Sequence, residues 1–307
     1  MLHIILPYVA ATSFATSCWG FMKCSHERKD PNWLMQIHRV TVFSTCLTII
    51  TYAGVELFLT TFTLFLLVVA TLDRTLLEKT RHRHQQEPTE IVDFARSFIW
   101  IVLVIWIIRS FVIQPYRVPT GSLEPTVMPG DFLAVNQYIY GLRLPVLHKK
   151  LLKVSHPKRG DIVVFRPPHD PYQIFVKRVI GLPGETITYK DKKIFIDGKL
   201  VPQEFIGTDI DRYNLPTPLP VIRVSEKLNG KNHDIFLNPY EDHYPNLTTK
   251  IPEGHYFMMG DNRDNSGDSR AWGTVPEKDL IGKAVMVIMN WDAFHWTIHW
   301  NRIGLRL

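Results

Sequence analysis

A serine and a lysine in this chain have the surroundings expected of a proteolytic pair. Ser122 lies in the stretch VPTGSLEPTVMPGD, residues 118–131. Gly121 precedes it, and Pro119 and Pro125 lie close on either side. Proline fixes φ and glycine permits backbone angles closed to other residues, so such a loop presents a hydroxyl from a rigid, irregular backbone. An ordinary surface turn has the same composition, and Ser122 therefore becomes a candidate nucleophile only if a base accompanies it.

The base that fits is a lysine inside an apolar strand. No histidine after residue 114 lies in a motif that marks a Ser-His-Asp triad. A lysine accepts a serine proton only when it is neutral, which requires burial to lower its pKa from about 10.4 by about two units. In FVKRVIG, residues 175–181, strand alternation places Lys177 on one face with Phe175 and Val179. The alternative is an edge-strand lysine whose amine faces water.

A polar loop supplies partners for a buried lysine. Residues 260–270 read GDNRDNSGDSR, directly after the apolar run HYFMM. The acids do not fall at the spacing of a calcium loop, which leaves a solvated turn as the alternative. We expect Ser266 to hydrogen-bond Lys177, with Asp268 and Arg270 as a bracing ion pair.

With these residues in place, the chain resembles bacterial type I signal (leader) peptidases, especially the Gram-negative form. The resemblance rests on four blocks in family order, VPTGSLEPTVMPGDFLAVNQYIYGLR, KRGDIVVFRPP, FVKRVIGLPGE and GDNRDNSGDSRAWGTVP. It covers most of residues 110–290. It implies a Ser/Lys dyad protease that removes signal peptides from exported preproteins at the outer face of the cytoplasmic (inner) membrane, with no cofactor.

The resemblance also implies roles for individual residues. Ser122 matches the nucleophile and Lys177 the general base. The oxyanion hole would consist of the Ser122 backbone N–H and the hydroxyl of Thr120, where the family more often has serine. Leu123 stands at a position that is commonly methionine. The positions that support the dyad match Ser266, Asp268, Arg270, Asp261 and Arg178.

The resemblance further implies shallow apolar pockets for small substrate residues at the −1 and −3 positions. Their walls would include Tyr116, Val118, Phe175 and Val176. An extended peptide that pairs with a strand edge exposes alternate side chains to one wall, which fits this expectation.

Composition excludes several other classes of protein. The 307 residues carry a net charge of +6, but no run of five or six basic residues occurs, so nucleic acid is not an expected partner. Much of the basic charge flanks apolar segments, as membrane orientation requires. All three cysteines lie before residue 47, and no Cys/His spacing typical of zinc occurs, so we expect no metal and no disulfide in the C-terminal region.

Three apolar stretches, near residues 4–22, 40–72 and 98–113, predict a multi-pass membrane anchor. Basic residues 23–39 and 73–96 should lie in the cytoplasm. We therefore expect an anchor over residues 1–96, a last transmembrane helix over 97–113 and a periplasmic catalytic domain over 114–307. The middle stretch forms either two short spans turning near Gly54 and Glu56 or one long tilted helix, so three or four spans remain open. Membrane lipid and the secretion translocon are the expected partners besides signal peptides.

The C-terminal region has the pattern of strands and turns that is typical of an all-β domain. Short β-branched runs bounded by Gly, Pro and Asp predict mainly antiparallel sheets with little helix. Asp197-Gly198 between two such runs predicts a two-residue hairpin. Residues 202–250, rich in Pro, Asn and Asp, predict an insertion or cap of lower regularity.

The stretch from Trp291 to Trp300 alternates along the chain. Phe294, Trp296, Ile298 and Trp300 would share one face of a strand. That face either joins the core or enters the lipid interface.

Two other functions remain open at this point. A self-cleaving Ser/Lys domain of the SOS-repressor type shares the dyad, but the apolar spans and the lack of a helix-turn-helix disfavour it. A non-catalytic, membrane-tethered binding module for exported chains is disfavoured because every position of the dyad is filled.

Overall fold

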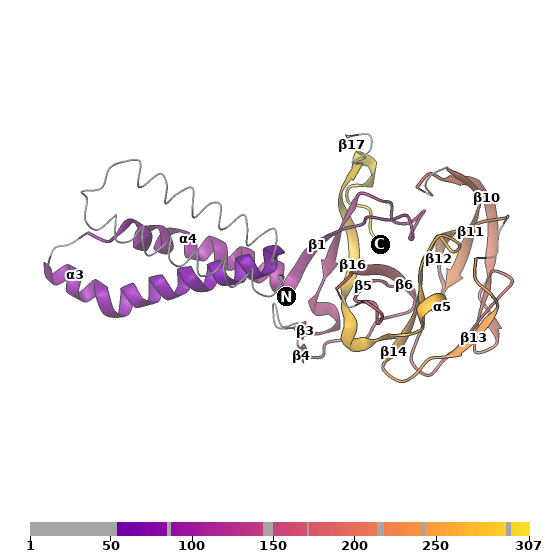
Figure 1. The fold of residues 1–307 in the computed structure, drawn as a ribbon, viewed down its shortest axis with the longest axis horizontal. Helices are drawn as coiled ribbons and strands as arrows, with labels where there is room; N and C mark the ends of the chain where they lie inside the picture. The colour runs from indigo at the N-terminus through magenta and orange to yellow at the C-terminus, as the bar shows by residue number, and fades with distance from the viewer. Residues whose placement is uncertain are drawn as a thin grey trace. The chain divides into compact units, whose positions relative to one another are not determined.

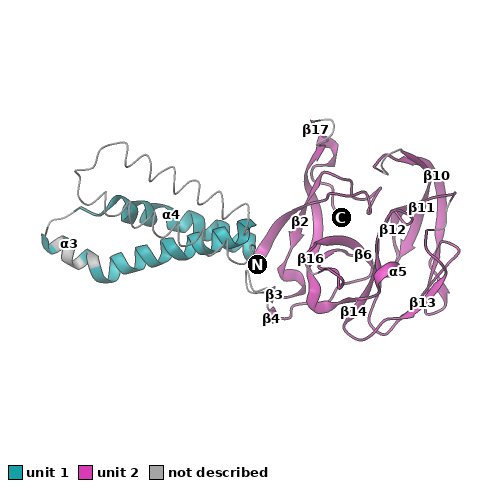
Figure 2. Ribbon diagram, viewed as in Figure 1, with its two compact units in different colours: residues 1–110, 144–149 teal, residues 111–143, 150–307 magenta. Residues whose placement is uncertain are grey.

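The computed structural model describes residues 54–84, 87–143, 150–170, 172–213, 218–240, 243–292 and 296–307. The chain divides into two compact units, residues 1–110 with 144–149 and residues 111–143 with 150–307 (Figure 2). The first predicted apolar stretch, the three cysteines and Phe294 lie outside the described residues.

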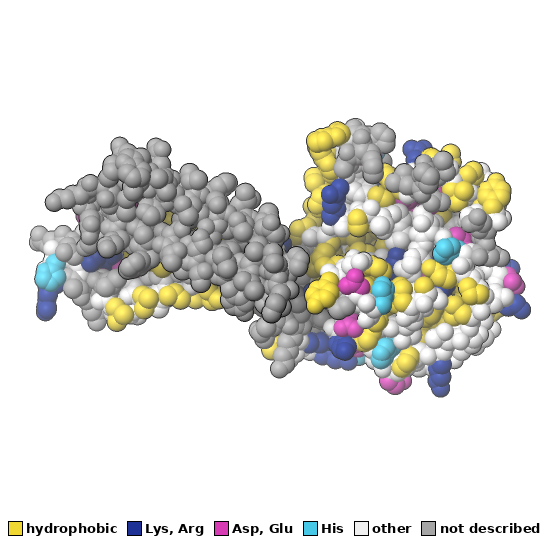
Figure 3. All heavy atoms as spheres, in the orientation of Figure 1, with side chains coloured by type: hydrophobic (Ala, Val, Ile, Leu, Met, Phe, Trp, Pro, Cys, Tyr) yellow, Lys and Arg dark blue, Asp and Glu magenta, His cyan; other side chains and the backbone are white. Residues whose placement is uncertain are grey.

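Unit 1 contains two helices that are long and apolar enough to cross a membrane, Gly54–Leu76 and Glu90–Val112. The first continues through the π-helix η1 (Asp73–Leu77) into α3 (Glu78–His84), and the second consists of α4 (Glu90–Ile107) and the π-helix η2 (Ile108–Val112). Many of their exposed side chains are hydrophobic, among them Leu64, Val68, Trp100 and Ile101, and Figure 3 shows a row of hydrophobic side chains along this unit.

The two helices are joined by apolar packing and by buried ion pairs. Leu66, Ala95 and Ile99 form their common core. The buried Asp73 carboxylate contacts one guanidinium from each helix, those of Arg81 and Arg96, each at 2.6 Å. Part of the stretch predicted as a basic loop is therefore helical, because these charges are paired within the bundle.

Unit 2 is built around one eight-stranded antiparallel sheet (Figure 1). The strand order is β1-β2-β16-β5-β6-β14-β15, with β17 paired to β16. The bounds are β1 Ile113–Arg117, β2 Asp131–Asn136, β5 Ile162–Phe165, β6 Phe175–Gly181, β14 His255–Met259, β15 Val275–Pro276, β16 Leu280–Asp292 and β17 Thr297–Ile298. The prediction of a mainly antiparallel all-β region is confirmed, and the FVKRVIG stretch is strand β6 at its predicted bounds.

Smaller sheets complete unit 2. One has the order β13-β7-β8-β9, and β3 pairs with β4. Their bounds are β3 Leu142–Arg143, β4 Lys150–Leu152, β7 Thr186–Lys190, β8 Lys193–Ile196, β9 Lys199–Leu200 and β13 Leu247–Lys250. The short helices are η3 Tyr138–Tyr140, α5 Ser269–Trp272, η4 Glu277–Asp279 and η5 Trp300–Arg302. The predicted hairpin at Asp197-Gly198 joins β8 to β9, and both turn residues have positive φ, +48° and +76°.

The expectation of low regularity for residues 202–250 was wrong. This part of the chain forms a three-stranded antiparallel sheet of β10 (Gln203–Asp211), β11 (Leu219–Leu228) and β12 (Lys231–Leu237). The sheet has its own small core of Val224, Ile235 and Leu237. Its strands do not alternate strictly, since Ile235, Phe236 and Leu237 are consecutive buried apolar residues, and Pro- and Asn-rich turns separate the strands, so the sequence pattern did not mark a regular sheet.

The C-terminal aromatic stretch is not one strand. Strand β16 ends at Asp292, and Trp291 pairs with Ile298 of β17 across a hairpin. Trp296 has φ +53° and a 79% exposed side chain, and Trp300 is 73% exposed. The core-facing alternative is therefore wrong for both tryptophans, because the chain reverses between the two predicted halves of the strand.

Candidate active site

The loop that carries Ser122 is fixed at its base and by its apolar side chains. It connects the neighbouring strands β1 and β2, and two backbone hydrogen bonds close it, from Val118 N to Asp131 O and from Gly130 N to Val118 O, each 2.8 Å. Leu123 and Val127 are buried in the main core. Ser122 is half-buried between these anchors, so its position is determined by the sheet beneath it.

The polar loop after β14 holds the backbone on both sides of the serine. Asn262 N donates to Ser122 O at 3.2 Å, and Asn262 Nδ2 donates to Gly121 O at 3.3 Å. Sequence reasoning did not select Asn262. The polar composition of its loop was the available signal, but contacts with a loop 141 residues away cannot be read from spacing.

Lys177 lies in the middle of the sheet, on β6 between β5 and β14, and is only 4% exposed. Phe175 and Val179 join one hydrophobic cluster, while Val176 packs against another, as strand alternation predicts. The amine lies 5.9 Å from the Phe175 ring centroid. Burial lowers the pKa of Lys177 to about 8, while Asp268 acts to raise it and Arg270 to lower it.

Gly260 brings the remaining parts of the site together. Met259 pairs with Arg178, so the antiparallel register continued by one residue places Gly260 beside Lys177. A Cβ added at Gly260 would lie 2.2 Å from Ser266 Oγ and 2.3 Å from Ser122 O. Ser266 is buried, and its hydroxyl has no hydrogen-bond partner among the described residues, so the predicted hydrogen bond to Lys177 is not formed in this structure. A buried hydroxyl without a hydrogen-bond partner lowers the free energy of unfolding. The Ser266 hydroxyl is therefore either needed for function or retained at a cost in stability.

The close approach at Gly260 gives a prediction. Gly260→Ala should lower kcat/KM on a precursor by at least about 100-fold, because the methyl group would displace the Ser122 backbone or Ser266 by an amount that matters for catalysis. Gly267→Ala is the matched control, since a Cβ there meets nothing within 4 Å, and it should stay within about twofold of wild type. Equal activities of the two variants would contradict the proposed convergence at Gly260.

Asp268 and Arg270 form a fully buried ion pair. Arg270 Nε and Nη2 donate to the two carboxylate oxygens at 2.9 and 2.7 Å. The same carboxylate accepts from Gly260 N at 3.0 Å, which fixes the backbone beside Lys177. The guanidinium lies between two aromatic rings, 4.9 Å from the Tyr189 centroid and 4.0 Å from that of Tyr244. These rings were not selected from the sequence, because they belong to distant segments.

A second buried pair links the serine loop to the lysine strand. Arg178 binds both carboxylate oxygens of Asp261, at 2.8 and 2.6 Å, and Thr126 of the serine loop donates to the same carboxylate at 2.6 Å. Burial alone would raise the pKa of Asp261, but the Arg178 guanidinium outweighs it and lowers that pKa. This carboxylate therefore stays charged and connects β6, the polar loop and the serine loop.

Two further buried pairs were missed at the sequence level. Arg263 and Glu226 are both fully buried, and Arg263 Nη1 donates to Glu226 Oε2 at 3.0 Å. Arg302 Nε donates to the buried Asp131 at 2.8 Å, where the serine loop ends. Arg263 lies in the polar loop that was singled out, but the sequence around Glu226 and Arg302 has no feature that marks them.

The residues predicted to bind the oxyanion and the substrate lie on the edge strand β1, on the loop that follows it and on the interior strand β6. Strand β1, which contains Tyr116, is the first in the sheet order and pairs on one side with β2. Thr120 is exposed, and neither its hydroxyl nor the Ser122 N–H makes a hydrogen bond within the described part of the chain. Both donors are thus available to a substrate. Of the residues predicted to form the substrate pockets, Val118 is buried in the main core, Tyr116 and Val176 are half-buried against it, and Phe175 is half-buried against a neighbouring cluster.

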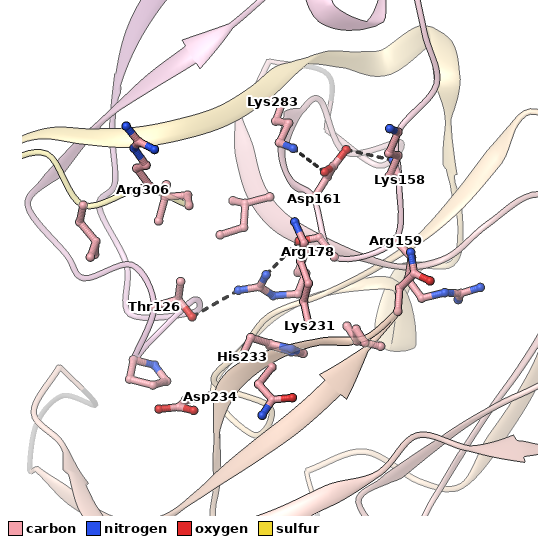
Figure 4. Close-up of a pocket in the computed structure, with 18 of the residues that line it drawn as sticks. Thr126, Lys158, Arg159, Asp161, Arg178, Lys231, His233, Asp234, Lys283 and Arg306 are labelled. Carbon is pink, nitrogen blue, oxygen red and sulfur yellow. Dashed lines mark hydrogen bonds and ion pairs between the residues drawn. The ribbon is translucent and has the colours of Figure 1, made fainter.

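A separate pocket of about 770 Å³ opens beside Arg178 and contains neither Ser122 nor Lys177 (Figure 4). Its cations are largely paired within the protein. Arg178 Nη2 donates to Thr126 at 3.3 Å, and Lys283 Nζ donates to Asp161 at 2.7 Å. Among the described residues no group of His, Cys, Asp and Glu is arranged to hold a metal ion.

Comparisons with known proteins identify the family of this chain. Residues 91–291 match the family model described as "Signal peptidase, peptidase S26". The chain is 40% identical over 233 residues to a protein named signal peptidase I from Pseudomonas fluorescens, a match that covers 71% of this chain and 78% of the relative. A signal peptidase I from Buchnera aphidicola is 39% identical over 249 residues, covering 68% and 79% of the two chains. A crystal structure of a signal peptidase I from Enterococcus faecalis V583 matches with 28% identity and a TM-score of 0.29, covering 43% of this chain and 98% of that chain.

Proposed function

Since the chain belongs to the signal peptidase family, peptidase S26, and is a hydrolase that removes signal peptides, we propose that it does so with a Ser122/Lys177 dyad through an acyl-enzyme. The observation that carries the proposal is the environment of Lys177. A lysine in the centre of a sheet, with a pKa lowered to about 8 by burial, is neutral often enough near pH 7 to act as a base. The serine loop is held beside the same strand through Thr126, Asp261 and Arg178.

In the acylation half of the reaction, the neutral Lys177 amine takes the proton of Ser122 Oγ. The Ser122 oxygen attacks the carbonyl carbon at the cleavage site, and the carbonyl π electrons move to its oxygen. The Ser122 N–H and the Thr120 hydroxyl donate to this oxyanion. Collapse of the intermediate breaks the peptide C–N bond, and protonated Lys177 returns the proton to the leaving amine.

In the deacylation half, Lys177 takes a proton from water, whose oxygen attacks the ester carbonyl. The ester C–O bond then breaks, and Lys177 protonates Ser122 Oγ. The buried Ser266 hydroxyl lies on the same side of Gly260 as the Ser122 carbonyl and has no partner of its own among the described residues, and it would have to turn toward Lys177 to orient the amine in both halves. The Asp268–Arg270 pair would hold the backbone that carries it.

The substrates are exported preproteins. An extended segment that pairs with the edge strand β1 would present its −1 and −3 side chains to walls formed by Tyr116, Val118, Phe175 and Val176. Because these walls are made of bulky side chains, they would admit alanine-sized side chains and exclude larger ones.

We propose that helices Gly54–Leu76 and Glu90–Val112 cross the inner membrane and that the catalytic unit lies on the periplasmic side. The basic residues Arg81 and Arg96 near the ends that connect the two helices support a cytoplasmic connection. Lipid is then the solvent for the exposed apolar side chains of both helices. Contact with the secretion translocon stays a prediction.

The test is cleavage of a purified preprotein by the full-length protein in detergent, with the cut located by mass spectrometry. The proposal expects one cut, between the signal peptide and the mature chain, and acylation at Ser122 by a serine-directed inhibitor. Binding of the preprotein without a cut would indicate the non-catalytic module. Cleavage of the enzyme chain itself in place of the preprotein would indicate the self-cleaving alternative.

The proposal also predicts a pH dependence. Below about pH 8 the ammonium form of Lys177 predominates, so kcat/KM should fall about tenfold for each pH unit between 7 and 5. The check is the initial rate of cleavage of one precursor across this pH range. The thermal midpoint, measured at each pH, excludes unfolding as the cause of a lower rate. A kcat/KM that stays constant between pH 5 and 7 would mean that no base with this pKa takes part.

A further inference from the structure

The nucleophile loop contains a buried carboxyl group that the proposed reaction does not use. Glu124 lies two residues after Ser122, and its side chain is only 3% exposed. Its backbone N–H donates to Gly121 O at 3.0 Å, which closes the turn around Ser122. A carboxyl group in this place must either find partners or remain protonated.

The Glu124 side chain fills the space that a side chain at position 121 would occupy. A Cβ on Gly121 would lie 2.3 Å from Glu124 Oε1. The carboxyl group therefore covers one face of the glycine that precedes the nucleophile, while Asn262 holds the carbonyls of Gly121 and Ser122. Together these contacts determine the direction of the Ser122 N–H, which is one of the two proposed oxyanion donors.

The surroundings of this carboxyl group suit a neutral acid. Oε1 finds no hydrogen-bond partner among the described residues. The facing charged or titratable groups are Asp211 and Asp209 of β10, Tyr213 after it, and Arg302 of η5. Asp211 is itself buried and accepts hydrogen bonds from Asn262 Nδ2 at 2.6 Å and Asn265 Nδ2 at 3.1 Å.

Arg302, the one cation in this group, is already paired with another carboxylate. Arg302 binds Asp131 and donates to Thr126 O at 3.1 Å. Burial, followed by the charge of Asp211, raises the pKa of Glu124 from 4.5 to about 8, and Arg302 only partly opposes this. At neutral pH the carboxyl group is therefore protonated, and at higher pH it carries a charge facing two other carboxylates.

We propose that Glu124 is a positioning residue for Ser122. In this role Glu124 is a neutral carboxylic acid that packs over Gly121 and faces Asp211 of the β10–β12 sheet. Ionisation would repel it from Asp211 and draw it toward water, and Gly121, without a side chain of its own, would lose the contact that restricts it. In a profile of kcat/KM against pH, activity should therefore fall at alkaline pH because Glu124 ionises. This is in addition to the fall at acid pH caused by protonation of Lys177. Only the kinetic predictions from this inference rest on the proposed function.

Glu124→Gln tests the proposal because it keeps the shape and neutrality of the acid but cannot ionise. In the full-length protein we expect Glu124→Gln to retain kcat/KM within about threefold at pH 7 and to keep that activity at pH 9.5, where wild type declines. Glu124→Ala should lose about tenfold or more at pH 7, mainly in kcat. Glu204→Gln, at an exposed position of β10, is the matched control and should follow wild type at every pH.

A second measurement needs no activity. Unfolded Glu124 titrates near 4.5 and the folded form near 8, so between these values the native state binds a proton that the unfolded state has released. Stability should therefore fall as pH rises across this window in wild type and in Glu204→Gln, relative to Glu124→Gln. The thermal midpoint of Glu124→Gln should exceed that of wild type by a margin that grows from pH 5 to 8.

Two results would overturn the proposal. One is a Glu124→Gln protein that is as impaired at pH 7 as Glu124→Ala, which would mean that the carboxylate form is needed. The other is a margin in thermal midpoint that does not change with pH, which would mean that Glu124 is ionised throughout. If Ser122→Ala still cleaved precursor, the proposed dyad would fail, but the thermal measurement would keep its meaning.

Discussion

Lys177→Met is expected to reduce precursor cleavage by at least about 10⁴-fold, and Ser122→Ala to do the same. Methionine preserves most of the packing of the lysine stem but cannot accept a proton, so the loss isolates the role of the amine. Lys199→Met, at an exposed position of β9, is the control and should retain activity. The double variant Ser122→Ala/Lys177→Met should be no less active than either single one, because nucleophile and base act as a unit.

The same substitution should stabilise the fold. In the unfolded chain Lys177 keeps its proton up to about pH 10.5, whereas in the folded protein it releases it near 8. Below pH 8 the native state therefore contains a buried ammonium, and its removal should raise the free energy of unfolding by on the order of 3 kcal/mol. The gain should shrink as pH rises from 8 to 10.5. An active Lys177→Met protein, or one that is folded but destabilised at pH 7, would contradict the assignment.

Asp268→Ala is expected to lower the free energy of unfolding by about 3–5 kcal/mol, because it leaves the Arg270 guanidinium buried without its partner. Asp234→Ala removes one carboxylate of a half-exposed pair with Arg223 and should cost no more than about 1 kcal/mol. Denaturant titration of both variants provides the comparison. Equal losses would mean that the buried pair contributes no more than a surface pair.

The effect on catalysis should separate the two members of this pair. Asp268 raises the pKa of Lys177 and Arg270 lowers it. Asp268→Ala should therefore move the acid limb of kcat/KM to lower pH, and Arg270→Met should move it to higher pH. In the double variant the two shifts should largely cancel, and the loss of stability should be smaller than the sum of the single losses. Shifts in the same direction for both single variants would contradict the electrostatic account.

The strands around the site could be predicted because their signals are local. Strand β6 and the hairpin at Asp197-Gly198 follow from alternation and from turn chemistry, which act within a few residues. The three-stranded sheet of residues 203–237 was not predicted as regular, because Pro and Asn are frequent in its turns and its strands do not alternate strictly. The C-terminal hairpin was read as one strand, because alternation does not record where a chain reverses.

The site shows a similar division. Ser122, Lys177 and the Asp268–Arg270 pair lie in stretches whose composition marks them before any contact is known. Glu226 and Asn262 reach the site through tertiary contacts, which leave no trace in spacing. Glu124 is an intermediate case, since it lies within the nucleophile loop, but its burial and its proximity to Asp211 emerge only when β10 folds beside that loop.

The central claim is that burial lowers the pKa of one amine far enough for a fraction of it to be neutral, and so able to act as a base, near pH 7. Its direct test is the titration of Lys177 in the full-length protein by NMR of isotope-labelled lysine side chains, with the resonance assigned by its absence in Lys177→Met. The account predicts a pKa of about 8, well below the ordinary lysine value of 10.5. A lysine at position 177 that keeps its proton to pH 10 or above would contradict it.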